Sequence, residues 1–559
     1  MSRDRPASMR PAGRAVEARE PRRAGAAAHP VSTRRVAARA AAIAALLERH
    51  GVIGFAGLTV AYWGITVAMA RHKPLWNDEL YTYYIAILPT MRDVWAALMA
   101  RGEQMPPLFY VPTRLVLGAF GFGHVAMRLP EMIGFWVMSA CLFAAVRRHT
   151  GGSAALCAAA LPLVTTAYFF AFEARPYALV LGAAAVAYLC WQEVTLGRRR
   201  TPALVGCCLA LATAVSLHYY AVLLLLPFAL GEAVRTIERR RIDVAIWIAL
   251  ALSLVPLAFM LPLIRAGADY AGAFWSPPQW LNVPAFYEEL LAPALIPVLA
   301  VLLLGMAVSA FGRAREATAS SAPFPLPLHE IAAALGFLLL PLVAVALAKV
   351  ATGAFVNRYV ISTVIGLSLL TGAGVAAGFR RHPNARVVAA ACLMGWFVLA
   401  SARERLEPTG YSIPISAATI ERPVEWVGAV PDRTLPVVIA DPHTFTVVWH
   451  YGETIRPRLV YLADPDLALK HLGHNSVERG MLDLVKPWFG MRVEPFERFI
   501  AEHDRFLVYG DFVRRAFLNW LLPELHARGL RTELLNRAGD NMLLLVTAPG
   551  EAPSAALAP

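Results

Sequence analysis

Charged residues are scarce in this chain. Of its 559 residues, 16% are charged and 58% are hydrophobic, and the mean hydropathy is +0.52. Soluble proteins carry about 25% charged residues. A buried core does not account for so large a deficit. The composition therefore excludes an ordinary soluble protein and indicates that lipid surrounds most of the chain.

Lysine is also scarce, because only four of the basic residues are lysines: Lys73, Lys349, Lys470 and Lys486. The formal net charge of +13 comes from arginine. This bias is typical of phosphate or nucleic-acid binding or, alternatively, of a GC-rich genome, which the abundant alanine favours. The arginines form short clusters between apolar runs, so nucleic acid is not indicated as a partner.

Cysteine is absent from every polar part of the sequence, since all six cysteines lie inside apolar runs. This placement excludes a disulfide framework and a cysteine-rich zinc site. No GxGxxG, P-loop or HExxH motif is found either. The loops that carry the arginine clusters are too short to hold an α/β domain, which excludes a nucleotide-sugar transferase of the soluble kind.

Apolar runs of membrane-spanning length dominate the rest of the sequence. A helix needs about 20 residues to cross ~30 Å of hydrocarbon. We therefore predict a polytopic α-helical membrane protein with about eleven transmembrane helices, near residues 52–71, 127–146, 153–172, 177–195, 202–217, 220–235, 243–263, 291–311, 330–350, 359–379 and 386–401.

The arginine clusters predict the topology. Five loops hold fourteen arginines, and the alternate short loops hold only Arg175, Arg265 and Arg358. Arginine-rich loops are typically cytoplasmic. Residues 106–120 are apolar enough to span, but a crossing there would place every later cluster outside. We therefore expect them to form an interfacial helix within a long outer loop, residues 72–126.

Three regions follow from this topology. Residues 1–50 hold eleven arginines and are expected to form a disordered basic tail in the cytoplasm; a transit peptide has a similar composition. Residues 51–402 form the membrane domain. Residues 403–559 alternate helical stretches with strand-like runs, so we expect an extracytoplasmic α/β domain. The strand-like runs are residues 436–440, 458–463, 505–510 and 541–548.

Ionisable and aromatic residues gather in the first outer loop. Asp78 and Glu79 directly follow the first span, beside Trp76 and Tyr81. A carboxylate pair at a membrane surface can accept a proton from a nucleophile or hold a divalent metal. The aromatic rings can stack on sugars. A helix cap beside an interfacial aromatic belt would also explain this pattern.

The later outer connections carry further candidates. Glu173 and Arg175 lie between two spans with almost no loop to solvate them, so they are expected to face a cavity or each other. His218 flanks another tight turn, where a structural role is the alternative. Arg358 and Tyr359 begin a span. An arginine can bind a phosphate bidentately, although it can also extend to lipid headgroups.

Six motifs occur in chain order in the membrane domain: WNDELYTYY, EQMPPLFY, HVAMRLPEMIG, FEARPYAL, LHYYAVLLLLP and FVNRYV. Together they resemble bacterial membrane glycosyltransferases of the GT-C superfold. The resemblance is to the dolichyl-phosphate-mannose protein mannosyltransferase-like group, whose relatives include the lipid A aminoarabinose transferases and the rhizobial lipopolysaccharide galacturonosyltransferases. One departure is Met105, which stands where many relatives have histidine.

The resemblance implies a polyprenyl-phosphate-linked sugar donor, an inverting transfer and an active site at the outer face of the bacterial cytoplasmic membrane. It implies Asp78 as the catalytic base or as the carboxylate that orients the acceptor, and Glu79 as a second catalytic residue that supports Asp78 or contacts the donor. It also implies Glu173 as the acidic residue of the second outer loop, and Arg358 with Tyr359 near the carrier phosphate. Together with the candidates from the outer loops, the predicted substrate-binding residues are Trp76, Tyr81, Glu103, Glu173, Arg175, Tyr177, His218, Tyr219, Arg358 and Tyr359. The acceptor would be a lipid, polysaccharide or protein of the cell envelope.

Two other functions remain open from the sequence. A flippase or transporter of lipid-linked saccharides would place ionisable residues in mid-span and show inverted repeats, neither of which is evident. A polysaccharide polymerase or ligase would place its large outer loop late in the chain, whereas here the long loop comes first. No cofactor or metal ligand set is identified, and an adjacent carboxylate pair suits a metal-free or a metal-dependent mechanism.

Overall fold

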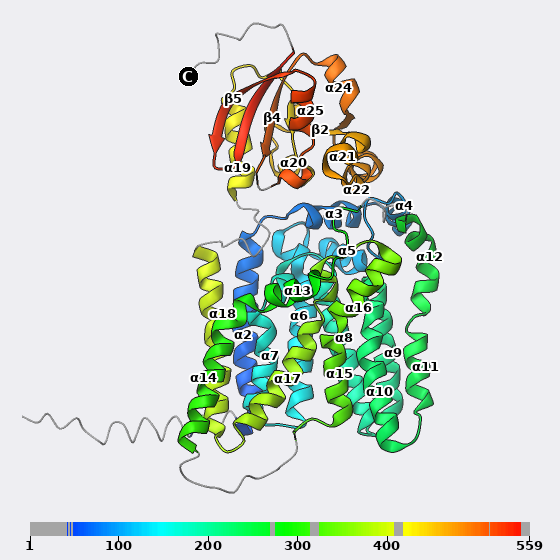
Figure 1. Cartoon of the computed structure of the whole chain (residues 1–559), viewed down its shortest axis with the longest axis vertical. Coiled ribbons are helices and arrows are strands. Elements are labelled where there is room, and N and C mark those ends of the chain that lie inside the picture. The colour runs from blue at the N-terminus through cyan, green and yellow to red at the C-terminus, as the bar shows by residue number, and fades with distance from the viewer. Residues whose placement is uncertain are drawn as a thin grey trace, which may run out of the picture.

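The computed structural model describes residues 42, 45, 48–268, 274–312, 324–406, 417–513 and 515–548. Most of the predicted N-terminal tail lies outside these residues. Figure 1 shows two parts, a long helical bundle and a smaller domain that contains a sheet and lies over one end of the bundle.

The bundle is built from apolar helices that run along its length (Figure 1). They are α2 (Gly51–His72), α6 (His124–Arg147), α7 (Gly152–Ala160), α8 (Tyr177–Thr195), α9 (Arg200–Leu217), α10 (Leu225–Arg239), α11 (Val244–Leu252), α12 (Val255–Ala268), α14 (Leu295–Gly312), α15 (Leu328–Leu338), α16 (Leu340–Leu347), α17 (Thr363–Gly378) and α18 (Pro383–Leu406). Short 3-10 or π turns extend several of them.

Within the described ranges, eight helices are long and apolar enough to cross a membrane, or ten if two bent pairs each count as one span. The predicted span 153–172 is one such pair, bent by 76° between Val164 and Thr166, and the predicted span 330–350 is the other, bent by 46°. The predicted span 359–379 is the shorter helix α17. The exact count of eleven is therefore not confirmed, although the polytopic helical architecture is.

Small residues let the central helices approach closely. A Cβ atom added to Gly134 of α6 would lie 2.7 Å from the carbonyl oxygen of Ala178, and one added to Gly182 of α8 would lie 2.6 Å from that of Gly134. Lipid tails are as apolar as the helices, so no hydrophobic effect drives the helices together, and close backbone contact supplies van der Waals attraction instead. It fixes α8, and with it the connection that carries Glu173.

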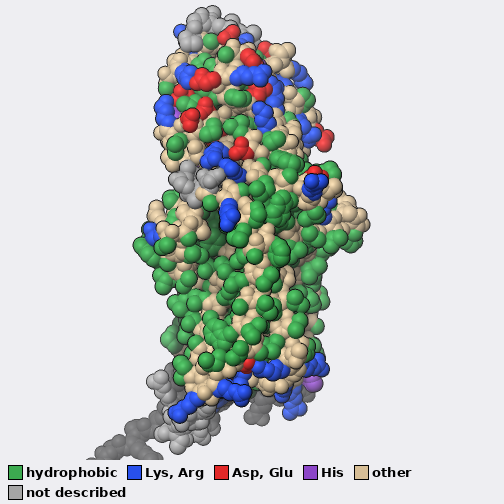
Figure 2. All heavy atoms as spheres, turned by 90° about the vertical axis from the view of Figure 1, so that its right-hand side faces the viewer, with side chains coloured by type: hydrophobic (Ala, Val, Ile, Leu, Met, Phe, Trp, Pro, Cys, Tyr) green, Lys and Arg blue, Asp and Glu red, His purple; other side chains and the backbone are tan. Residues whose placement is uncertain are grey.

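The surface of the bundle is a broad apolar belt. Figure 2 shows lysine and arginine side chains gathered at the end of the belt that is distant from the C-terminal domain. The arginine clusters of the α6–α7, α8–α9, α10–α11 and α17–α18 connections belong to this basic end.

The opposite end carries the first long loop. After α2 come α3 (Asn77–Ala86), α4 (Met91–Met99), the turn η1 (Pro107–Phe109) and α5 (Tyr110–Phe120). These helices, with α13 (Asn282–Leu291), lie toward the end of the bundle under the C-terminal domain (Figure 1). The 14-residue apolar stretch Pro107–Phe120 falls short of a span.

The C-terminal domain is an α/β structure around one sheet of six strands in the order β3-β2-β1-β4-β6-β5. Strands β1 to β4 pair in parallel, and β6 pairs antiparallel with β4 and β5. The strands are β1 (Val437–Ile439), β2 (Leu459–Ala463), β3 (Val493–Pro495), β4 (Arg505–Asp511), β5 (Arg531–Ala538) and β6 (Asn541–Thr547). The four predicted strands coincide with β1, β2, β4 and β6.

Helices cover this sheet: α19 (Ala417–Ala429), α20 (Pro442–Tyr451), α21 (Pro465–Leu472), α22 (Ser476–Gly480), α23 (Lys486–Phe489), α24 (Phe496–Glu502) and α25 (Leu521–Ala527). Helix α20 lies on the side of the domain that faces the bundle and packs against α3 (Figure 1). The domain thus adjoins the loop in which the sequence places the carboxylate pair.

Candidate active site

Glu79 is fully buried in a clamp between α3 and α6. Its Oε1 accepts from Nε of Arg128 and its Oε2 from Nη2 of Arg128, each at 2.6 Å. The backbone N–H of Ala174 also donates to Oε1 at 2.8 Å. A bidentate, charge-assisted pair of this kind is strong and directional. It locks α3 to α6 and to the turn before α8.

Arg128 extends the clamp to the end of α2. Its Nη1 donates to the carbonyl oxygens of Ala70 and Lys73, each at 2.7 Å, and its Nη2 donates to that of Pro74 at 3.0 Å. Arg128 is not among the residues that the sequence predicts for the site. The signal was present, because Arg128 stands at the outer end of a predicted span, where the positive-inside rule disfavours arginine.

Both carboxylate oxygens of Glu79 are therefore occupied, and its Oε2 also accepts from the N–H of Trp76 at 3.3 Å. Burial opposes ionisation of Glu79, but the charges of Arg128 and Lys73 hold its pKa below the usual value. A general base needs an accessible lone pair. The geometry thus gives Glu79 a supporting role, and the helix-cap contact expected of this loop comes from Glu79 rather than Asp78.

Asp78 points away from the clamp. Its Oδ2 lies 3.0 Å from Nη2 of Arg358, and its Oδ1 accepts from the side-chain amide of Asn77 at 3.3 Å. Burial opposes ionisation, but the charge of Arg358 and then that of Arg175 outweigh it, so the pKa of Asp78 is below its usual value. The Asp78 side chain remains 16% exposed, so this ionised carboxylate is accessible to a ligand.

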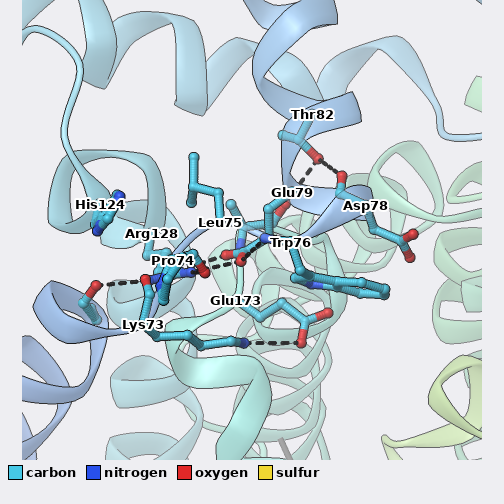
Figure 3. Close-up of polar contacts among 12 residues, drawn as sticks. Lys73, Pro74, Leu75, Trp76, Asp78, Glu79, Thr82, His124, Arg128 and Glu173 are labelled. Carbon is cyan, nitrogen blue, oxygen red and sulfur yellow. Dashed lines mark hydrogen bonds and ion pairs between the residues drawn. The ribbon is translucent and has the colours of Figure 1, made fainter. Parts of the chain in front are cut away.

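Glu173 lies on the same side as Asp78. Figure 3 shows the two carboxylates pointing in one direction, with the indole of Trp76 between them. Oε2 of Glu173 is 3.9 Å from Nζ of Lys73, and its Oε1 has no hydrogen-bond partner within the described residues. Burial raises the pKa of Glu173 to about 7, although Lys73 opposes this shift.

Arg175 and Glu103 form an ion pair next to Asp78. Nη1 of Arg175 lies 2.9 Å from Oε2 of Glu103 and donates to the backbone carbonyl of Asp78 at 3.2 Å. The arginine thus ties the second outer connection to the first loop at two points, one near its start and one near its middle. The sequence motif departs from its relatives just after Glu103, yet the residue itself is firmly held.

Aromatic side chains surround Arg358. Its guanidinium lies 5.8 Å from the ring centroid of Tyr177, and the ring of His218 lies 5.5 Å from Tyr177 and 5.1 Å from Tyr359. Nδ1 of His218 accepts from the N–H of Tyr220 at 3.2 Å. Burial and then Arg175 lower the pKa of His218 to about 3, so this imidazole is neutral.

A cavity of about 320 Å³ opens between Glu173 and Arg358. Aromatic and polar side chains from α13 and the segments before α13 and α17 complete its wall, among them Trp275, Asn282 and Glu289. Small-molecule sites are typically ~300–1,000 Å³, mostly apolar and supplied with a few convergent polar groups. The cavity fits that description, with an acid and a guanidinium at its wall.

Of the predicted binding residues, Glu173 and Arg358 line this cavity, whereas Tyr81 and Tyr219 have other neighbours. The hydroxyl of Tyr81 donates to Sδ of Met481 at 3.7 Å and its ring packs edge-on against Phe489, both in the C-terminal domain. Tyr219 lies near Glu103 instead. Arg175 contacts Asp78 and Glu103, and Tyr177, His218 and Tyr359 line a second pocket together with Arg358. Lys73, which the sequence did not predict for the site, lies 3.9 Å from Glu173. In the part of the chain that the structure describes, no three His, Cys, Asp or Glu side chains are grouped as metal ligands.

Comparisons with known proteins agree with this architecture. Residues 104–264 match the family model "Dolichyl-phosphate-mannose-protein mannosyltransferase". Two crystal structures of ArnT from Cupriavidus metallidurans, one in the apo state and one bound to undecaprenyl phosphate, are similar over 90% of this chain and 99% of theirs. Their TM-scores are 0.53 and 0.52, with 13% and 14% sequence identity.

Among curated proteins, none matches the chain. At such low identity the ArnT structures establish the fold, while the family model covers the segment from the first outer loop to α12. The chain therefore shares the fold of the ArnT structures, in agreement with the polytopic helical architecture that its sequence predicts.

Proposed function

We propose that the chain transfers a sugar, with inversion, from a polyprenyl-phosphate-linked donor to a cell-envelope acceptor at the outer face of the bacterial cytoplasmic membrane. The observation that carries this proposal is the Asp78–Arg358 pair beside a cavity that also contains Glu173. The family match of residues 104–264 and the undecaprenyl phosphate in the ArnT structure support a lipid-phosphate donor.

This reaction needs a base for the acceptor and a cation for the departing phosphate, and we assign these roles to Asp78 and Arg358. An acceptor hydroxyl attacks the anomeric carbon, its proton passes to Asp78, and the bond between that carbon and the phosphate oxygen breaks. The electron pair leaves with the polyprenyl phosphate. Arg358 stabilises the departing charge, which is the electrostatic contribution that a preorganised guanidinium can make.

The ion pair also connects donor binding to base activation. Without substrate, Asp78 and Arg358 neutralise each other at 3.0 Å. A donor phosphate that takes the guanidinium removes the main charge that keeps the pKa of Asp78 low. Burial then favours protonation of Asp78, so the carboxylate becomes a better base when the donor is in place.

The direct test is transfer of radiolabelled sugar from a panel of undecaprenyl-phosphate sugars, with hexosyl and pentosyl members, by purified protein supplied with cell-envelope extract. We expect label in an acceptor and release of undecaprenyl phosphate for at least one donor. Movement of the intact lipid across a vesicle membrane without transfer would instead identify a flippase.

The proposed face predicts the result of topology mapping. Because the arginine clusters form the cytoplasmic loops, a reporter fused at Arg199 or Arg240 should read as cytoplasmic. A reporter fused after residue 420 should read as exported. A cytoplasmic C-terminal domain would contradict the proposed orientation and place the Asp78 site on the inner face.

Donor binding should depend on the planar guanidinium of Arg358. Arg358→Ala removes a charge-assisted hydrogen bond, for which we expect about 10- to 100-fold weaker binding of an undecaprenyl-phosphate sugar. Arg358→Lys keeps the charge but not the fork and should have a smaller effect. Binding is measured by ligand-induced thermal stabilisation. Parental affinity in both variants would make Arg358 a headgroup anchor only.

Donor affinity should also fall as the pH rises through about 7, the pKa of Glu173. A phosphodiester beside Glu173 disfavours the ionised carboxylate and raises its pKa further, so binding takes up a proton. By linkage, we expect about 3- to 10-fold weaker binding at pH 8 than at pH 6. The control is Glu173→Gln, which should remove this dependence; an unchanged pH slope in that variant would contradict the linkage.

A further inference from the structure

The C-terminal domain is held against the first outer loop by specific polar contacts from α20. Oγ1 of Thr446 donates to the side-chain oxygen of Asn77 at 2.7 Å, next to Asp78. The backbone N–H of Leu75 donates to the hydroxyl of Tyr451 at 2.8 Å. These bonds come from positions near the middle and the end of α20, so the helix has one fixed rotation relative to α3.

The first turn of α20 is fixed independently. Oδ1 of Asp441 accepts from the N–H of Thr444 at 2.9 Å, which caps the helix, and from Nη1 of Arg515 at 3.0 Å. An N-cap of this kind stabilises the first turn by about 1 kcal/mol. His443 lies in this first turn, between Asp441 and Thr444.

His443 is directed at the site. Its ring meets the indole of Trp76 edge-on, with the centroids 6.4 Å apart and the planes at 90°. Trp76 is the ring that lies between the carboxylates of Asp78 and Glu173 (Figure 3). The charges of Arg515, Asp78, Asp441 and Arg358 all act on the imidazole. No hydrogen bond from the His443 side chain is found among the described residues.

We propose that the C-terminal domain completes the active site, and that His443 binds the nucleophilic hydroxyl of the acceptor beside Asp78. This inference rests on the proposed sugar transfer and gives a role to a domain for which the sequence offered none. A neutral imidazole has one donor and one acceptor nitrogen, so it can hold a hydroxyl while leaving its proton free to pass to Asp78.

The electrostatic setting keeps the ring in that neutral form. Burial, and then the charge of Arg515, lower the pKa of His443 to about 4, although Asp78 and Asp441 oppose the shift and Arg358 adds to it. The imidazole is therefore uncharged across the range in which the enzyme would work, and it does not compete with Arg358 for the donor phosphate.

The test compares His443→Ala and His443→Gln with the parent chain, using an undecaprenyl-phosphate sugar that the parent transfers and a concentration series of cell-envelope acceptor. We expect the alanine variant to raise the apparent KM for acceptor about tenfold, as for one lost hydrogen bond. Donor binding and the thermal unfolding temperature should be unchanged. Glutamine retains a donor and an acceptor and should restore part of the loss.

His450→Ala is the matched control, because His450 lies on the same helix and contacts Tyr84 at 3.1 Å but not the Asp78 cluster. It should keep the parental KM. The inference is overturned if His443→Ala transfers like the parent, or if both histidine variants lose activity in proportion to thermal stability. Absence of transfer by the parent itself would overturn the proposed function, and this inference with it.

Discussion

Asp78→Asn is expected to lower the turnover of sugar transfer by about 10²–10⁴-fold, the usual contribution of a positioned general base. The change is nearly isosteric and removes the basicity while leaving an oxygen toward Arg358. The residue is at the end of the bundle and not in its packed interior, so folding should survive. The measurement is single-turnover transfer at saturating donor.

Donor binding should change in the opposite direction in this variant. Asp78 competes with the donor phosphate for Arg358, since its carboxylate lies 3.0 Å from the guanidinium. Asp78→Asn should therefore bind the undecaprenyl-phosphate sugar at least as tightly as the parent does. A purely structural Asp78 predicts weaker binding together with a lower unfolding temperature. A fully active Asp78→Asn protein would remove Asp78 from the mechanism.

The convergence of the site could be predicted because the loops on one face of a membrane protein share that face. Asp78, Glu173 and Arg358 are far apart in sequence, but each stands at the same end of an alternating series of spans. The arginine clusters indicated which connections belong together. The sequence could not indicate which acid meets which base, because that depends on the rotation of each helix about its axis.

The adjacent pair Asp78 and Glu79 illustrates this limit. Both are near the start of α3, and their side chains diverge by about 100° around the helix, as successive residues do. One therefore reaches Arg358 in the site, while the other reaches Arg128 in the interior. Two neighbouring carboxylates in a sequence thus have different partners and different roles.

The bent spans and the domain contact were missed for other reasons. Hydropathy identified residues 153–172 as one span, but Pro162 interrupts the α-helix there, and Pro341 lies in the first turn of the helix after the second bend. Tyr81 was assigned to sugar binding because aromatics suit that role. It packs on the C-terminal domain instead, and this domain docking could not be derived from either part alone.

Arg128→Ala is expected to destabilise the protein by about 3–5 kcal/mol, because it leaves the buried carboxylate of Glu79 without its hydrogen-bonded ion-pair partner. It also frees the carbonyl oxygens at the end of α2 that Arg128 now satisfies. Glu79→Gln should cost less, since its amide oxygen still accepts from Ala174 and Arg128 keeps its carbonyl partners.

Thermal unfolding in detergent measures the stability of both variants. The control is Arg498→Ala, which changes an exposed arginine of the C-terminal domain and should leave the unfolding temperature unchanged. If Arg128→Ala fails to accumulate, Arg128→Lys supplies a measurable intermediate case. An Arg128 variant that unfolds at the parental temperature yet transfers no sugar would move the Glu79–Arg128 pair from the scaffold into the chemistry.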